Sequence, residues 1–116
     1  MEIVEILKAL GDETRVRIIH LVQEKPLCVC EIQEILGISQ SNTSRHLIKL
    51  KNAKLITGDK KAQWVYYSLA PDTFQKYSFL EAFMGNLNTY KDLESDRRAL
   101  KTLQEKGFSC ENLTKN

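Results

Sequence analysis

Residues 37–56 read GISQSNTSRHLIKLKNAKLI, and the expected fold class follows mainly from their pattern. Ser39 is a suitable N-cap for a helix that runs to about Lys54, because a serine side chain accepts a hydrogen bond from the first free backbone N–H groups of a helix. Just upstream, residues 29–36 have the apolar spacing of a short helix that ends at Gly37. Two short helices joined by a tight turn containing glycine form a helix-turn-helix.

The positive charge of the chain is concentrated in the same region. The 116 residues carry a net charge of +2. Residues 37–67 hold six Lys or Arg against Asp59 alone, a balance of +5, whereas residues 1–36 sum to −3 and residues 68–116 to zero. A solvated face can have this composition, but a basic block that coincides with a helix-turn-helix favours binding to a polyanion.

The flanking segments predict further helices and a hairpin. Upstream, residues 2–10 and 13–23 have helical apolar spacing, and Asp12 is a suitable cap for the second helix. Downstream, residues 55–69 read LITGDKKAQWVYYSL, which predicts a two-stranded hairpin with a basic tip. The fold class expected from this order is mainly α with a small β-hairpin.

A helical region is expected to follow Pro71. Its apolar residues recur at steps of three and four, and we interpret this stripe as a dimer interface; the residues are Leu80, Phe83, Leu87 and Tyr90. We expect one domain over residues 1–108 that includes the terminal dimerisation helices, and a frayed tail over residues 109–116.

The order of helices, helix-turn-helix, hairpin and helix is that of a winged helix, and the sequence resembles the ArsR/SmtB family of small dimeric repressors over nearly its full length. The matching stretches are LGDETRVRII, LCVCEI, SQSNTSRHLIKLKNAKLI and WVYYSL. The resemblance implies a homodimeric winged helix-turn-helix that binds a double-stranded DNA operator. Twofold symmetry then predicts an inverted repeat with half-sites about one helical turn apart.

The second helix of the pair carries the expected DNA contacts. Gln or Asn can pair with adenine and Arg with guanine, while short polar groups and cations hold phosphates. The resemblance points to Gln40, Ser41, Ser44 and Arg45, and the residue types add Asn42 and Lys49 on the same helix. Lys60 and Lys61 at the tip of the hairpin are expected to meet phosphates, although exposed lysines can also simply solubilise a turn. We interpret His46 as structural.

Two cysteines, Cys28 and Cys30, stand at the start of the first helix of the pair. One reading is that both are small buried apolar residues. The other is that the helix dipole lowers their pKa and favours thiolates, which bind soft ions. Residues i and i+2 of a helix point about 200° apart. Bringing both sulfurs onto one atom would therefore distort the first turn, and we hypothesise that this distortion couples ion binding to DNA release.

The stretch LCVC resembles the arsenite-responsive branch of the family, which implies As(III) or Sb(III) as inducer and no organic cofactor. A third cysteine commonly follows three residues after the second in that branch, but Gln33 occupies this position here. Three alternatives stay open: Cys110 or a cellular thiol supplies the third sulfur, two sulfurs suffice, or Cys110 is a tail thiol with no role. Cadmium, lead, zinc or oxidation remain alternative signals for the same cysteines.

Other functions fit the sequence less well. The family's zinc-type site is not expected, because no His follows His46; we interpret Asp92, Glu94 and Asp96 as solvent-facing helix acids. We do not expect an enzyme, since the sequence has no Gly-rich phosphate loop and no convincing carboxylate pair. The start of the chain has no uninterrupted apolar run, and the cysteine count is odd, so we expect a cytoplasmic protein with no membrane association.

Overall fold

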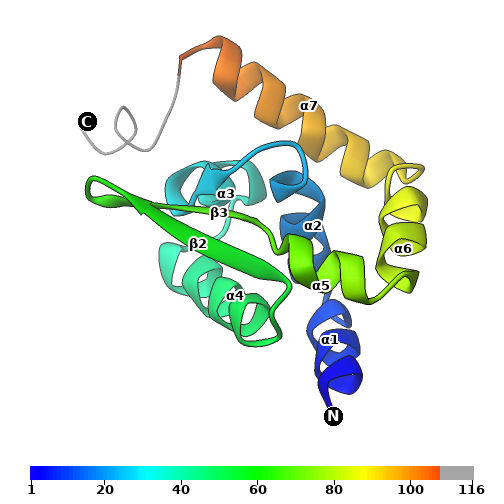
Figure 1. The fold of residues 1–116 in the computed structure, drawn as a ribbon. Helices are drawn as coiled ribbons and strands as arrows, with labels where there is room; N and C mark the ends of the chain where they lie inside the picture. Colours follow the sequence, from blue (N-terminus) through cyan, green and yellow to red (C-terminus); the bar gives the residue numbers. More distant parts are fainter. Residues whose placement is uncertain (108–116) are drawn as a thin grey trace.

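The structure is a computed structural model, it describes residues 1–107, and helices dominate it (Figure 1). The predicted tail, residues 109–116, lies outside the described residues. No helix among those described is long and apolar enough to cross a membrane. The helices are α1 (Glu2–Leu10), α2 (Glu13–Val22), α3 (Val29–Leu36), α4 (Gln40–Asn52), α5 (Pro71–Lys76), α6 (Phe79–Leu87) and α7 (Lys91–Glu105). The strands are β1 (Leu27–Cys28), β2 (Ile56–Lys61) and β3 (Trp64–Leu69).

The helix-turn-helix has the predicted boundaries, apart from the end of α4 at Asn52. Gly37 ends α3 with φ +67°, a left-handed conformation that glycine adopts without steric cost. The Ser39 side chain then caps α4 by accepting a hydrogen bond from the Asn42 backbone N–H at 3.1 Å. These local signals fix the turn between the two helices.

The end of α4 turns the chain into the sheet. Lys54 has φ +63°. Its backbone N–H donates to the Lys51 carbonyl at 2.9 Å, and the Leu55 N–H donates to the Leu50 carbonyl at 3.0 Å. This is the Schellman arrangement, which satisfies two carbonyls at a helix end. Leu55 is fully buried directly after it, so the turn also anchors β2 to the core.

The sheet has three strands in the order β1-β3-β2, not the two strands predicted from the sequence. β1 pairs antiparallel with β3, with Leu27 opposite Tyr67 and Cys28 opposite Tyr66. A two-residue strand is too short to show an alternating pattern, and its partner lies about forty positions further along the chain. Strand β1 was not predicted because its formation depends on a partner far away in the sequence, which a local sequence pattern does not reveal.

The β2–β3 hairpin is the predicted wing and projects from the body (Figure 1). Lys61 pairs with Trp64, so two residues form the turn. Ala62, the first of them, has φ +57°. Hairpin turns of this length require positive φ at the first central position, where glycine or asparagine is usual. The backbone of Ala62 in the turn of the wing is therefore strained.

The core forms around α2, with α1, α3, α4 and α7 packed on it. Arg15 fixes three of these helices together. Its side chain donates to the Ala9 carbonyl of α1 at 2.6 Å, and its guanidinium lies 3.3 Å from His46 Nδ1 of α4. The contact agrees with our interpretation of His46 as structural.

The C-terminal region contains three helices and differs from the prediction in two respects. First, the proposed dimer stripe faces its own protomer in part, because Leu80 is 0% and Leu87 is 6% exposed. Helical spacing shows that a face is apolar but not what covers it. Second, the exposed apolar side chains gather mainly at the other end of the chain, on and beside α1; they are Met1, Ile3, Val4 and Leu7.

A long-range ion pair holds α7 against α2. Arg17 donates to both carboxylate oxygens of Asp96, with N–O distances of 2.8 and 2.9 Å. Asp96 is only 7% exposed. The interpretation of Asp96 as a solvent-facing acid is therefore wrong. Asp96 lies one helical turn after the exposed Asp92 but faces α2, and helical spacing alone does not show where a neighbouring helix lies. Its partner lies 79 positions away in the sequence.

Candidate nucleic-acid interface and thiol site

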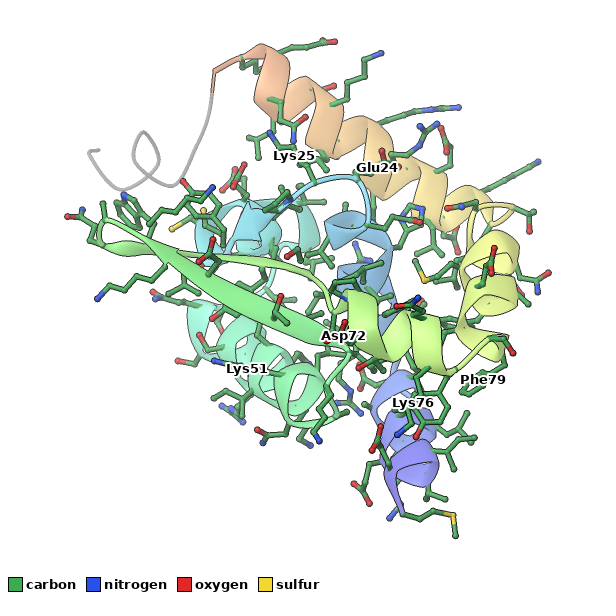
Figure 2. The ribbon with its side chains drawn as sticks, in the orientation of Figure 1. Glu24, Lys25, Lys51, Asp72, Lys76 and Phe79 are labelled. Carbon is green, nitrogen blue, oxygen red and sulfur yellow. The ribbon has the colours of Figure 1, made fainter. Side chains whose placement is uncertain are left out.

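One side of α4 is buried and the other is open. Thr43, Leu47 and Leu50 are at most 2% exposed and face the core. The predicted DNA-contacting residues lie away from them: Ser44 is half-buried, and Gln40, Ser41, Asn42, Arg45 and Lys49 are exposed. Figure 2 shows Lys51 on the same helix, and it too is exposed. This surface offers amides, hydroxyls and cations, which are the groups that read bases and hold phosphates.

Sequence reasoning missed one residue on this surface. Ile48 is 57% exposed, although it is apolar and lies within a helix that packs on the core. It follows Ser41 and Arg45 at steps of four and three, so the three side chains share one stripe. The signal was present in the sequence, since Ile48 falls outside the Thr43-Leu47-Leu50 spacing. An apolar side chain here can contact the methyl group of thymine.

The wing carries both predicted lysines, and both are exposed. Lys60 pairs with Val65 and Lys61 with Trp64 on the neighbouring strand. Successive residues of a strand point to opposite faces. Lys60 and Lys61 therefore lie on opposite faces of the hairpin, and the expectation that both contact phosphates stays a prediction.

The two cysteines lie at a strand–helix junction and not within one helix. Cys28 ends β1 and is the N-cap of α3, with extended φ −89° and ψ 167°, whereas Cys30 lies in the first turn. The angle of 200° expected between them in a helix does not apply, because Cys28 is not helical. The Cys28 backbone N–H donates to the Glu31 carboxylate at 3.1 Å, which ties the junction together.

The expectation that the helix dipole lowers the thiol pKa is wrong for Cys30. Burial raises the pKa of this thiol above its usual value, and the charge of Glu31 raises it further. Glu31 is itself 4% exposed, so its charge is poorly screened by water. Glu31, whose carboxylate accepts the hydrogen bond from the Cys28 N–H, thus opposes the thiolate that the helix N-terminus would favour.

The two sulfurs also differ in accessibility. Cys28 is 1% exposed and is disulfide-bonded in the structure, whereas Cys30 is half-buried and a free thiol. The composition had indicated reduced thiols; a disulfide depends on spatial proximity, which a cysteine count does not show. Cys110, the candidate third ligand, lies outside the described residues. Within residues 1–107, no group of three His, Cys, Asp or Glu side chains is placed to hold a metal ion.

The acids considered for a zinc-type site do not converge. Asp92 is exposed, while Glu94 accepts hydrogen bonds from Arg97 and Asp96 from Arg17. The bond from Arg97 lowers the pKa of Glu94, which keeps it ionised. The two more buried acids are thus committed to arginines in the part of the chain that the structure describes.

Comparison with known proteins identifies the family. Residues 12–57 match the family model described as "Bacterial regulatory protein, arsR family". The arsenic resistance transcriptional regulator ArsR1 of Pseudomonas putida is 44% identical over 71 residues, which are 60% of this chain and 56% of that protein. A cadmium resistance regulatory protein, the CadC homolog of Staphylococcus aureus, is 40% identical over 70 residues, 60% of this chain and 58% of that protein. The matched region thus covers less than two thirds of these relatives.

The fold comparison extends further along the chain. HlyU from Vibrio cholerae superposes with a TM-score of 0.63 at 31% sequence identity, and the match covers 74% of this chain and 87% of HlyU. The helix-turn-helix, the wing and the family match over residues 12–57 agree with one another. The fold is a winged helix-turn-helix, and residues 12–57 form a helix-turn-helix domain of the arsR family of bacterial regulatory proteins.

Proposed function

We propose that the chain is a transcriptional repressor that binds an inverted-repeat DNA operator as a homodimer. Support comes from the exposed polar and basic side of α4 and from the basic wing. The family and the relatives named above are regulators and not enzymes. The recognition helix α4 enters the major groove, and the wing lysines contact flanking phosphates.

The outer face of α1 is the surface proposed for dimerisation. The exposed fraction of the side chain is 53% for Leu7 and 37% for Val4. Exposing neighbouring apolar side chains to water is unfavourable, and such a patch is typical of a protein–protein interface. The variant Val4→Glu/Leu7→Glu should shift the protein to monomer in sedimentation equilibrium. The matched variant Glu81→Lys, at an exposed position on α6, should remain dimeric.

DNA binding is tested with an operator selected by the protein from a randomised inverted-repeat library. Arg45→Ala should weaken specific binding by about 10- to 100-fold, because a bidentate Arg–guanine contact is worth about 1–3 kcal/mol. Lys60→Ala should instead lower the slope of log affinity against log salt, by about one unit per lost phosphate contact. Equal effects of Arg45→Ala on the operator and on random DNA would contradict base reading by Arg45.

We further propose that As(III) or Sb(III) releases the DNA by binding Cys28 and Cys30 in the reduced protein. The observation that carries this is the position of Cys28. It ends β1, which pairs with the wing strand β3, and it begins α3, which packs on the recognition helix α4. A ligand that pulls Cys28 and Cys30 onto one atom must shift this junction, and both DNA-binding elements adjoin it.

The bonding step is balanced without a redox change. As(OH)₃ and two thiols give a dithiolated As–OH species and two waters, so two As–O bonds and two S–H bonds are replaced by two As–S bonds and two water O–H bonds. A third sulfur, from Cys110 or a small thiol, would displace the last hydroxide as a third water. Neutral thiols therefore suffice, and the raised pKa of Cys30 is no obstacle at equilibrium.

The proposal is tested by fluorescence anisotropy of fully reduced protein on its operator, titrated with arsenite and antimonite. Wild type should release DNA, and Cys28→Ser/Cys30→Ser should stay bound. The single variants Cys28→Ser, Cys30→Ser and Cys110→Ser then measure how much each sulfur contributes. Release of the double variant by arsenite at the wild-type concentration would refute the assignment.

Cadmium is the second candidate signal, because a cadmium-resistance regulator is 40% identical over the matched region. The pH dependence separates the two ions. Cd²⁺ must displace one proton from each thiol, so its affinity should rise by up to about tenfold per thiol for each pH unit below the thiol pKa. The raised pKa of Cys30 extends that rise to higher pH. Arsenite binding consumes no net proton and should change little between pH 6 and 8.

Thiol oxidation is the third candidate, because Cys28 is disulfide-bonded in the structure. Peroxide treatment of the protein–DNA complex, followed by a dithiol reductant, tests it directly. Release by peroxide that the reductant reverses, with no release by arsenite, would replace the metalloid with oxidation as the signal.

A further inference from the structure

A cavity of about 720 Å³ opens between α2, α6 and α7. Most of it lies outside residues 12–57, the part that the family model matches. Tyr90, at the start of α7, also lines the cavity, whose apolar walls are supplied by Val16, Phe83, Leu87 and Leu93. This volume is in the range of sites that hold small organic molecules.

The charges that line the cavity are mainly negative. Arg17 is the sole cation among the lining residues, against Glu13, Asp92 and Asp96. Its guanidinium is already paired with both oxygens of Asp96. Glu13 and Asp92 are exposed and form no ion pair with any residue in the described range. The lining therefore has a formal charge of −2, which favours a cation and disfavours an anion.

The aromatic residues indicate which type of cation fits the cavity. Tyr90 is 61% exposed, which is unusual for a residue with a large ring, and Phe83 is half-buried on the cavity wall. The face of an aromatic ring attracts a weakly hydrated cation, and the apolar walls require an apolar body. A hard metal ion would use neither feature. We propose that this cavity binds an organic cation that carries an aromatic or other apolar body, independently of the cysteine site.

A structural role for the two acids is the competing explanation. Glu13 and Asp92 lie in the first turns of α2 and α7, where a carboxylate complements the helix dipole. That role accounts for the two acids, but it does not account for the adjacent cavity with Phe83 and Tyr90 in its lining. It also makes a different prediction, because loss of a dipole contact lowers stability without changing the affinity for any ligand.

The proposal is tested by isothermal titration calorimetry of the full chain with tetraphenylphosphonium. Tetraphenylborate, an anion of nearly the same shape, is titrated into a separate sample of the protein as the charge control. The test variant is Glu13→Gln/Asp92→Asn, which keeps shape and removes both charges. The matched control is Asp72→Asn/Glu81→Gln, which removes two exposed acids from the first turns of α5 and α6, outside the cavity. Tyr90→Leu tests the ring separately.

We expect saturable binding of one tetraphenylphosphonium per subunit, with a dissociation constant that rises at least about tenfold in Glu13→Gln/Asp92→Asn and also rises in Tyr90→Leu. The control variant should bind as wild type does. Unchanged affinity in Glu13→Gln/Asp92→Asn, with only a lower melting temperature, would show the dipole role and overturn the proposal. Absence of binding, or equally tight binding of tetraphenylborate in its separate titration, would overturn it as well.

Discussion

The helix-turn-helix and the C-terminal helices are held in place by contacts of very different range. In the helix-turn-helix, the Ser39 cap binds Asn42, three positions away, and the Schellman turn at Lys54 joins Leu55 to Leu50, five positions away. In the C-terminal region, Asp96 of α7 binds Arg17 across 79 positions. The helix-turn-helix is held by contacts between residues close together in the sequence. The position of α7 depends instead on a contact with α2, near the other end of the chain.

The largest effect that tests this contrast is expected from Asp96→Ala. The substitution leaves a part-buried guanidinium without its carboxylate, and we expect a loss of about 2 kcal/mol in the free energy of unfolding. This is less than the 3–5 kcal/mol of a fully buried pair, because the Arg17 side chain is 31% exposed. Urea denaturation measures the loss. Asp92→Ala, on the exposed side of the same helix, should cost less than about 1 kcal/mol.

Hydrogen exchange measures how far the effect of Asp96→Ala extends through the molecule. Hydrogen exchange in Asp96→Ala should accelerate in α7 more than in α4, because α7 loses its anchor on α2 while the local caps of α4 remain. Uniform acceleration across both helices would show that α7 and the helix-turn-helix unfold as one unit, and it would break the distinction drawn between them.

The same distinction explains which predictions from the sequence were correct. The caps at Asp12 and Ser39 and the stop at Gly37 located α2, α3 and α4 to within two residues, since each signal acts on its neighbours. The strand β1 was missed because its partner is β3.

The features of the candidate site also differ in whether local sequence patterns predict them. The exposed side of α4 follows from helical spacing, as does Ile48 once the spacing is applied strictly. The raised pKa of Cys30 does not, because it depends on the burial of the junction and on the inward position of Glu31. Phe83, Leu87 and Tyr90 in the cavity lining belong to the apolar stripe seen in the sequence. The cavity itself depends on how three separate helices pack, which the stripe does not show.

A smaller effect is expected from Ser39→Ala, which removes a purely local contact. The Ser39 side chain accepts from the Asn42 N–H at 3.1 Å on an exposed helix end. Loss of such a cap typically costs about 1 kcal/mol. Faster hydrogen exchange should be confined to the first turn of α4. Ser78→Ala is a suitable control, because Ser78 precedes α6 without forming a side-chain cap. Equal losses in the two variants would contradict the capping role.

The smallest expected effects are gains in stability from glycine at the two non-glycine positions with positive φ, Lys54 and Ala62. A side chain there is strained in the native backbone, so Lys54→Gly and Ala62→Gly should each stabilise by about 0.5–1 kcal/mol, after the flexibility that glycine adds to the unfolded chain is subtracted. Gly58→Ala provides the opposite sign, because a Cβ at Gly58 would lie 3.0 Å from Val65 Cγ1. All three substitutions act through a few neighbouring residues of β2, β3 or the end of α4. If Ala62→Gly destabilised the wing instead, the turn would have to be held by contacts beyond its own two residues, and the wing would then belong with the C-terminal helices and not with the locally determined helix-turn-helix.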